Sequence, residues 1–253
     1  MKHLLNAEGR QALLGFIEQS PLIGFDFDGT LAPIVDAPAR AEMRTRTRAL
    51  LHKVASRFAC VVLSGRARQD VCQRLGGIPV REVFGNHGLE PWHSSETLFL
   101  QVREWAAMLS EHLASRPGVW IEDKGFSLSI HYRSCADPRR ARKDALAVLA
   151  KLKGARILPG KLVYNVMPVS TLHKGTVFTA AMSYFKHESA LYVGDDQTDE
   201  DVFASCDGTR VMGIHVGTSR RSRAAYYLRH QEEIDELLEI LLRVPAAKRG
   251  QTG

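Results

Sequence analysis

Two aspartates stand one residue apart at the end of an apolar run, in the segment LIGFDFDGTL (residues 22–31). In an extended segment, residues i and i+2 share a side, so we expect Asp26 and Asp28 to point together and Phe27 to point into packing. Like charges held close resist burial unless a cation or a chemical role compensates for them. Gly29 lets the backbone turn tightly and present N–H groups to an anion.

A second group of acids follows another apolar run, in the segment GDDQTDED (residues 194–201). It holds Asp195, Asp196 and Asp199. Carboxylates gathered from two segments, without thiolates or paired histidines, suit Mg²⁺, a hard cation that prefers oxygen ligands. The two clusters together therefore predict a magnesium site.

The first cluster also suits phosphoryl transfer. Asp26 could attack phosphorus and form an aspartyl-phosphate, and Asp28 could protonate the leaving oxygen and then activate water. Lys174, Ser64 and backbone amides would hold the transferred phosphoryl group. Taken singly, a strand-end serine is usually a turn residue and a lysine is usually solvated. This interpretation therefore depends on the joint order of Asp-x-Asp, Ser, Lys and Gly-Asp-Asp along the chain.

A calcium-binding loop is the main competing interpretation of the first cluster, but the spacing of its residues does not match such a loop. If Gly29 is aligned with the glycine of such a loop, Gly24 takes the first position and Val35 the last, where an acid is needed. The second cluster fails in the same way, because its last position is Cys206.

Three short apolar runs position these groups: LIGF (residues 22–25), CVVL (60–63) and ALYV (190–193). They alternate with helical patterns such as VFTAAMSYF (177–185), which is typical of an α/β fold with a parallel sheet covered by helices. Ligands of such sheets bind beyond the carboxyl ends of the strands. The residues delivered there include Asp26, Asp28, Thr30, Ser64, Gly65, Arg66, Asp195, Asp196 and Asp199.

The middle of the chain has a different pattern, which predicts an inserted α/β domain. Asp137 and Pro138 form an N-cap and first position for a helix through Leu152. Four strand-like runs flank it: GVWIED, FSLSIHYR, ARIL and KLVYNVMP. Another helix precedes them, with an apolar stripe of Phe99, Val102, Ala106, Leu109 and Leu113. We expect an αββαββ cap at residues 97–169, inserted between core segments 1–96 and 170–253.

The predicted cap strands alternate in polarity. Phe126, Leu128, Ile130 and Tyr132 would share the face that packs on the helices, and Ser127, Ser129, His131 and Arg133 would share the other. On the last strand, Lys161, Val163 and Asn165 share a side. The polar face would line a wet cleft over the active site, or would simply be solvated.

Composition indicates an ordinary globular protein of 253 residues, with 45% hydrophobic and 25% charged residues and a net charge of +6. No apolar run approaches the ~20 residues of a membrane span, and no signal-peptide pattern is present, so we expect a cytoplasmic location. The cysteines are scattered, without zinc spacing, and should be reduced. We interpret the basic run SRRSR (residues 219–223) as a solvated surface, not a nucleic-acid site.

With these features the chain resembles the haloacid-dehalogenase-type phosphatases, and more narrowly the trehalose-6-phosphate phosphatases. The motifs that carry the resemblance span most of the chain: FDFDGTLAPIVDAP (25–38), LSGR (63–66), GNHGLE (85–90), IEDKGFSLSIHYR (121–133), GKLVYNVMP (160–168), HKG (173–175) and VGDDQTDEDVF (193–203).

The resemblance implies a Rossmann-like core with helices on both faces, an α/β cap and Mg²⁺ dependence. It implies Asp26 as the nucleophile and Asp28 as the general acid and base, with Ser64 and Lys174 completing the catalytic set. The metal would be held by Asp26, the Asp28 carbonyl and Asp195, with Asp199 in support. The resemblance implies that Arg66 and His87 lie near the substrate and that Glu122, Lys124 and Lys161 reach sugar hydroxyls from the cap. Together with polar residues of the strand ends and of the cap strands, the expected substrate-binding residues are Thr30, Gly65, Arg66, His87, Glu122, Lys124, His131, Arg133, Lys161 and Asn165.

Two cap residues depart from the family pattern. The family usually has glutamate where this chain has Asn165, and commonly a basic residue where Met167 stands. A carboxylate accepts two strong hydrogen bonds from sugar hydroxyls, whereas an amide offers one acceptor and two donors. We expect a sugar phosphate substrate, with trehalose 6-phosphate first and another disaccharide or sugar phosphate as the alternative.

Other functions fit parts of the pattern. A phosphomutase would keep the aspartates but return the phosphoryl group to a sugar. A non-catalytic module that binds phosphate or nucleic acid on the same fold is the alternative from another class. A phosphorylated cation pump is excluded because membrane helices are missing. We expect a monomer that acts on a small molecule, without nucleic-acid or membrane partners.

Overall fold

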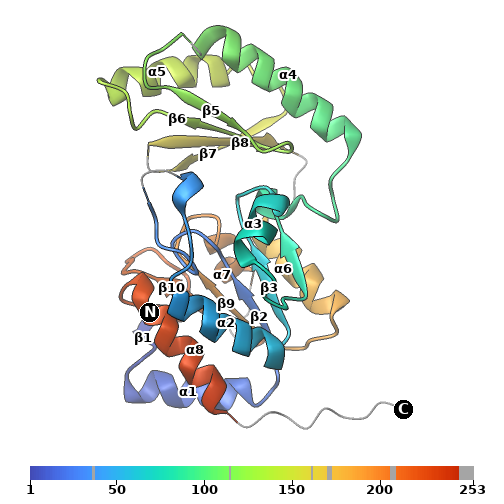
Figure 1. Ribbon diagram of the computed structural model, residues 1–253, viewed down its shortest axis with the longest axis vertical. Coiled ribbons are helices and arrows are strands. Elements are labelled where there is room, and N and C mark those ends of the chain that lie inside the picture. Colours follow the sequence, from blue (N-terminus) through green and yellow to red (C-terminus); the bar gives the residue numbers. More distant parts are fainter. Residues whose placement is uncertain (36–37, 114, 161, 170–172, 206–208, 245–253) are drawn as a thin grey trace. The chain divides into compact units, whose positions relative to one another are not determined.

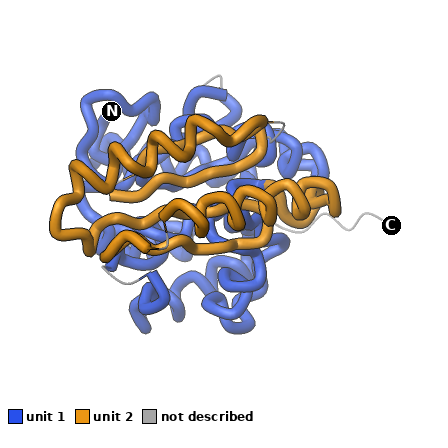
Figure 2. Tube along the Cα trace, turned by 90° about the horizontal axis from the view of Figure 1, so that it is seen from above, with its two compact units in different colours: residues 1–88, 172–253 blue, residues 89–171 orange. Residues whose placement is uncertain are grey.

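The computed structural model describes residues 1–35, 38–113, 115–160, 162–169, 173–205 and 209–244. It divides into two compact units, Met1–Gly88 with Leu172–Gly253, and Leu89–Thr171, which Figure 2 shows in different colours. Residues 89–96 belong to the second compact unit, whereas from the sequence we expected them in the first core segment. The predicted domain boundaries stay a prediction, and each unit is described by itself.

The first unit is built on a seven-stranded parallel sheet (Figure 1). Its strands, in spatial order, are β1 (Lys2–His3), β11 (Tyr226–Leu228), β10 (Val211–Val216), β9 (Ala190–Gly194), β2 (Leu22–Phe25), β3 (Cys60–Leu63) and β4 (Glu82–Phe84). All six pairings are parallel. The three strands predicted from the sequence are therefore confirmed, and they form the buried centre of the sheet, β9-β2-β3.

Helices cover both faces of this sheet, as predicted. One face packs on α1 (Ala7–Ile17), α2 (Thr45–Arg57), α3 (Arg68–Leu75) and α8 (Ile234–Arg243). The opposite face carries Tyr192, whose ring contacts Phe178 of α6 (Lys174–Tyr184) and Phe203 of α7 (Glu200–Ala204). In strands buried on both sides every residue is apolar or small, which explains why these runs do not alternate in polarity.

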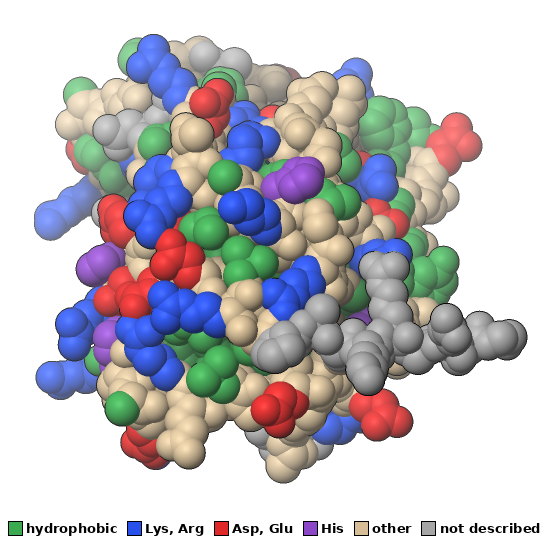
Figure 3. Space-filling view, turned by 60° about the horizontal axis from the view of Figure 1, so that its bottom comes forward, with side chains coloured by type: hydrophobic (Ala, Val, Ile, Leu, Met, Phe, Trp, Pro, Cys, Tyr) green, Lys and Arg blue, Asp and Glu red, His purple; other side chains and the backbone are tan. Residues whose placement is uncertain are grey.

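The surface around α1, α2 and α8 carries charges of both signs. Acidic and basic side chains lie next to each other on the face shown in Figure 3. Ion pairs join Arg10 to Glu236 and Arg46 to Glu239, which tie α1 and α2 to α8. The exposed arginines of the run 219–223 lie elsewhere, on the connection between β10 and β11.

The second unit is a four-stranded antiparallel sheet with two helices. The strand order is β5 (Trp120–Asp123), β6 (Leu128–His131), β8 (Val163–Pro168) and β7 (Ala155–Gly160). The helices are α4 (Glu96–Leu113) and α5 (Pro138–Leu149), so the chain order αββαββ is confirmed. Asp137 caps α5 as predicted, accepting a hydrogen bond from the Arg140 amide at 3.0 Å.

One face of this small sheet packs against the two helices. The shared core comprises Val102, Trp105, Leu109, Leu113, Leu128, Ile130, Tyr132, Ala145, Val148, Leu149, Leu152, Tyr164 and Val166. The predicted stripe of α4 was wrong for Phe99, which is 39% exposed. It lies in the first turn of α4, where its ring packs edge-to-face with Phe126. The helix predicted through Leu152 ends at Leu149. Across the described residues, no helix combines the length and apolarity that a membrane crossing requires.

Candidate active site

The first aspartate of the Asp-x-Asp pair lies just past the carboxyl end of β2. Asp26 is buried, and its backbone N–H donates to the Val193 carbonyl at 2.8 Å, which continues the pairing of β2 with β9. Phe27 is fully buried in the core, as predicted. The chain then turns at Gly29, whose φ of +86° is easily adopted only by glycine. Asp26 is thus fixed beside the strand that delivers the second acidic cluster.

Lys174 is a buried lysine in the first turn of α6, and it joins the two clusters. Its Nζ donates to Asp26 Oδ1 at 2.7 Å and to Asp199 Oδ1 at 2.8 Å. Burial alone would lower the pKa of Lys174, but the charges of Asp199 and Asp26 raise the pKa well above its usual value. The ammonium is therefore charged, and two of its three N–H donors are used by the two carboxylates.

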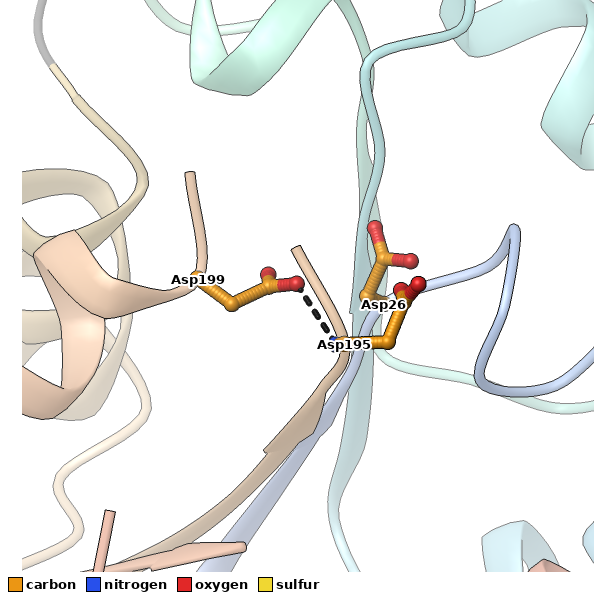
Figure 4. Close-up of side chains that lie close together, drawn as sticks. All are labelled: Asp26, Asp195 and Asp199. Carbon is orange, nitrogen blue, oxygen red and sulfur yellow. Dashed lines mark hydrogen bonds between the residues drawn. The ribbon is translucent and has the colours of Figure 1, made fainter. Parts of the chain in front are cut away.

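Asp199 organises the loop after β9. Its Oδ2 accepts the backbone N–H groups of Asp195 at 2.9 Å and Asp196 at 3.0 Å, the first of which Figure 4 shows. Its Oδ1 also accepts the Tyr192 hydroxyl at 2.7 Å. Burial raises the pKa of Asp196, but the Lys174 charge and the hydrogen bond from Thr198 outweigh it and hold this pKa at about 2. The loop is therefore held from within by its own carboxylates.

Three carboxylates meet closely enough to share one cation. One oxygen each of Asp26, Asp195 and Asp199 lies within 4.8 Å of the others (Figure 4). Burial, with repulsion from neighbouring acids, raises the pKa of Asp195 to about 8 and that of Asp199 to about 6, and raises the pKa of Asp26 well above its usual value. Asp195 Oδ1 is buried and has no hydrogen-bond partner in the described part of the chain. An all-oxygen donor set with an unsatisfied buried oxygen fits Mg²⁺.

The second aspartate of the pair has different partners. Both oxygens of Asp28 are bound by Arg66, through Nε at 2.6 Å and Nη2 at 2.7 Å. Nη1 of Arg66 donates to Asp70 at 2.9 Å, and Nη2 also donates to the Pro38 carbonyl at 2.8 Å. Burial would lower the pKa of Arg66, but the hydrogen bonds and charges of these carboxylates raise it. The Asp28 side chain is therefore held by Arg66, and it is not one of the three carboxylates that meet.

Ser64 and His87 lie together at the end of β3. Ser64 is 1% exposed, its Oγ accepts the Arg66 amide at 3.2 Å, and its carbonyl accepts the His87 amide at 2.9 Å. A Cβ on Gly65 would lie 2.6 Å from the His87 ring, so the glycine permits this close approach. The Thr30 hydroxyl is buried and makes no hydrogen bond among the described residues.

The predicted cap residues form a polar cluster within the second unit. Glu122 Oε2 lies 2.9 Å from His131 Nε2 and 3.8 Å from Lys124 Nζ. Ser129 Oγ donates to Asn165 Oδ1 at 2.6 Å across paired strands β6 and β8. These side chains alternate with the apolar ones that pack on the helices, so they occupy the other face of the sheet. Arg133 is exposed, and Lys161 lies outside the described residues.

Comparison with known proteins decides the family. A family model described as trehalose-phosphatase matches residues 24–232. The chain belongs to the trehalose-phosphatase family. Among curated relatives, trehalose-phosphate phosphatases of Mycobacterium tuberculosis and Mycobacterium marinum are 31% and 32% identical over 230 residues, which cover 84% of this chain and 59% of each relative. The chain therefore spans about three fifths of the length of these relatives.

Solved structures show the same fold. The C-terminal domain of C. albicans trehalose-6-phosphate phosphatase has a TM-score of 0.77 at 22% identity, covering 97% of this chain and 99% of that chain. An Aspergillus fumigatus trehalose-6-phosphate phosphatase has a TM-score of 0.62 at 24% identity, covering 97% and 100%. BT1666 of Bacteroides thetaiotaomicron, from the haloalkanoate (HAD) superfamily, has 0.59 at 16%, covering 90% and 96%. The family resemblance and the HAD fold expected from the sequence are confirmed.

The structure of this trehalose-phosphatase family member brings most predicted core residues to one edge of its parallel sheet. Asp26, Ser64 and Asp195 lie at the carboxyl ends of β2, β3 and β9, and Lys174 opens α6 beside them. Asp28 is near this edge, but its side chain is bound by Arg66. The chemical roles of all these residues stay predictions.

Three residues escaped the sequence-based reasoning. Asp70 binds Arg66 one helical turn away, and the i,i+4 spacing of opposite charges could have indicated it. Tyr192 donates to Asp199 from within an apolar strand, where only its hydroxyl signals a partner. Trp120 is 51% exposed and stacks on His131, with the two ring centroids 4.5 Å apart. This contact depends on the register of β5 and β6.

Proposed function

We propose that this chain is a phosphoric monoester hydrolase that removes the phosphoryl group of a phosphorylated disaccharide, with trehalose 6-phosphate as its preferred substrate. The observation that carries the proposal is the buried contact of Lys174 with Asp26 and Asp199. It holds a carboxylate beside an ammonium and an acidic cluster at the edge where α/β sheets bind ligands. The family membership and the names of the relatives support the same chemistry.

In the proposed reaction, an Asp26 oxygen attacks phosphorus and the bond from phosphorus to the sugar oxygen breaks. Asp28 donates a proton to that leaving oxygen, which releases the sugar as an alcohol. Asp28 then accepts a proton from water, whose oxygen attacks phosphorus, and the bond to Asp26 breaks to give inorganic phosphate. Each step conserves charge and protons without a further reactant.

Lys174 and Ser64 would hold the transferred group. Burial raises the pKa of Asp26, and the ammonium opposes this shift. It would also oppose negative charge on the phosphoryl oxygens. A Mg²⁺ ion held by Asp26, Asp195 and the Asp28 carbonyl, with Asp199 in support, would neutralise phosphoryl charge. Thr30, Gly65, Arg66 and His87 are the proposed neighbours of the phosphate.

The cap cluster is the proposed sugar-recognition surface. Glu122, Lys124 and His131, with Arg133, Lys161 and Asn165, would hydrogen-bond sugar hydroxyls. Asn165 already accepts from Ser129, which leaves its amide N–H groups to donate to a sugar. A family glutamate here could only accept, so this position is where the preferred sugar would differ.

The deciding experiment measures phosphate release from a panel of sugar phosphates with Mg²⁺, against an Asp26→Asn control. We expect release from trehalose 6-phosphate above all others, and none from the control. An isomerised sugar phosphate without free phosphate would indicate a phosphomutase instead. No turnover, together with salt-sensitive DNA binding, would indicate a binding module.

Metal dependence and assembly are tested separately. Chelation by EDTA should abolish turnover, and adding back Mg²⁺ should restore it more fully than Ca²⁺, since Mg²⁺ suits carboxylate sites that retain water. The monomeric state and the cytoplasmic location stay predictions; light scattering after size exclusion measures the former.

A further inference from the structure

The contacts of Asp28 extend into a chain of charged groups. Arg66 binds both Asp28 oxygens in a fork, with Nε at 2.6 Å from Oδ2 and Nη2 at 2.7 Å from Oδ1. A two-point contact of this kind fixes the plane of the carboxylate as well as its position. The Asp28 side chain is 38% exposed, whereas that of Arg66 is 9% exposed. The orientation of Asp28 is therefore set by the buried guanidinium.

Arg66 is in turn held by a residue that is absent from the proposed site. Its Nη1 donates to Asp70 Oδ2 at 2.9 Å, one turn along the chain in α3. Nη1 is the nitrogen that does not contact Asp28, so the two carboxylates bind opposite parts of the same planar group. If Asp70 were removed, the guanidinium could rotate and turn the Asp28 carboxylate with it.

Asp70 is itself anchored on both sides. Arg74 Nε donates to Asp70 Oδ1 at 3.0 Å and to Oδ2 at 3.1 Å. The guanidinium of Arg74 also donates to the carbonyls of Ala39, at 3.2 Å, and Ala41. The row Asp28–Arg66–Asp70–Arg74 therefore runs from the proposed proton donor to the backbone of the segment after β2.

We propose that Asp70 is a positioning residue that orients Asp28, through Arg66, for proton transfer to the sugar leaving group. This inference rests on the proposed function, because it needs Asp28 to act as the general acid. Arg66, besides being a proposed neighbour of the phosphate, holds Asp28, because its side-chain donors face two carboxylates and a carbonyl. Asp70 touches neither substrate nor phosphorus.

The effect of an Asp70 variant on substrates with different leaving groups distinguishes a positioning role from a purely structural one. A sugar alkoxide is a poor leaving group and needs protonation, whereas p-nitrophenolate leaves without it at neutral pH. A misoriented Asp28 therefore slows phosphoryl transfer from the sugar phosphate to Asp26 and spares the transfer from p-nitrophenyl phosphate. The later attack by water, in which Asp28 is the proposed base, is the same for both substrates, so the comparison uses kcat/KM, which reports the transfer step. A general loss of packing around α3 would slow both substrates together.

The test compares kcat/KM for trehalose 6-phosphate and p-nitrophenyl phosphate in wild type and Asp70→Asn. We expect kcat/KM for the sugar phosphate to fall at least about tenfold in the variant, while kcat/KM for the aryl phosphate stays within about twofold. Arg74→Gln, which frees Asp70 from its anchor, should give a smaller loss of the same selectivity. Arg74→Gln also provides the test if Asp70→Asn folds poorly.

Glu82→Gln is the matched control. It removes another carboxylate that pairs with an α3 arginine, Arg68 at 2.8 Å, and that does not reach Asp28. Both kcat/KM values should stay at the wild-type value. Equal losses of kcat/KM on the two substrates in Asp70→Asn, or no loss on either, would overturn the positioning role while leaving the proposed function intact. A wild-type enzyme that hydrolyses neither substrate would instead overturn the proposed function and this inference with it.

Discussion

Replacing Lys174 by methionine is the sharpest test of how the acidic cluster is held together. The ammonium is 1% exposed and lies 2.7 Å from Asp26 and 2.8 Å from Asp199, both buried. Methionine keeps most of the volume but leaves two buried carboxylates without their cation. Breaking a buried ion pair by removing one partner costs ~3–5 kcal/mol. We expect a fall of this size in the free energy of unfolding at pH 8 in EDTA.

The loss should depend on pH in a defined direction. The folded pKa of Lys174 is raised above its unfolded value, so its stabilisation is fully present at pH 8 and is lost only as the pH rises through the folded pKa. Without the ammonium, the already raised pKa values of Asp26 and Asp199 rise further, and both groups take up protons more readily. Protonation removes the uncompensated charge. The loss at pH 6 should therefore be smaller than the loss at pH 8.

Urea unfolding, followed by fluorescence or circular dichroism at the two pH values, measures these differences. The control is Lys53→Met, because Lys53 is an exposed lysine of α2 in the same unit. Its effect should stay within about 0.5 kcal/mol at both pH values. A Lys174→Met variant no less stable than this control, or one whose loss grows toward pH 6, would refute the electrostatic account. Its kcat should also fall by about 10²-fold or more.

Three further predictions concern the same groups. Asp26→Asn should abolish turnover on every substrate while the protein stays folded, since Lys174 keeps Asp199 as its partner; ordinary residual activity would contradict the nucleophile role. In EDTA the protein should lose stability as the pH rises from about 4 to about 8. The folded pKa values of Asp195, about 8, and of Asp199, about 6, exceed those of unfolded carboxyls. The folded state therefore binds more protons than the unfolded state over this range. At pH 8, Mg²⁺ at a hundred times its Kd should restore ~2.7 kcal/mol, which calorimetry with and without the ion measures; a stability that rises with pH in EDTA would be inconsistent with this cluster. Glu122→Ala should lower kcat/KM for the disaccharide phosphate by at least about tenfold while p-nitrophenyl phosphate hydrolysis changes little, and parallel losses on the two substrates would count against a sugar-binding role.

The sheet centre was predictable because its signal is local. The runs at 22–25, 60–63 and 190–193 are apolar throughout, too short for helices, and each is followed at once by polar residues. The parallel arrangement then required the polar ends to meet. The outer strands β1 and β11 have only two and three residues, too few to show a period. Short edge strands depend on their neighbours for stability and so leave little mark on the sequence.

The alternation of side chains along a strand does not reveal the partners of Asp28. Alternation places residues 26 and 28 on one side only while the backbone stays extended, and β2 ends at Phe25. Beyond it the chain turns, with the Gly29 amide bonded to the Ala32 carbonyl at 2.7 Å. Asp28 then meets Arg66 from the neighbouring strand end. The identity of the closest opposite charge is decided by this three-dimensional approach and not by spacing along the chain.

Two glycines explain why the acidic motifs converge so tightly. A Cβ on Gly29 would lie 2.1 Å from Asp195 Oδ2, and one on Gly194 would lie 2.2 Å from Asp199 Cγ. Each glycine thus provides the space that a carboxylate of the second cluster occupies. Neither glycine has chemistry of its own, yet alanine at either position would push an acid away from the others. The close approach that raises the carboxylate pKa values is therefore built into the backbone, and it is the same approach that would let one divalent cation bind all three.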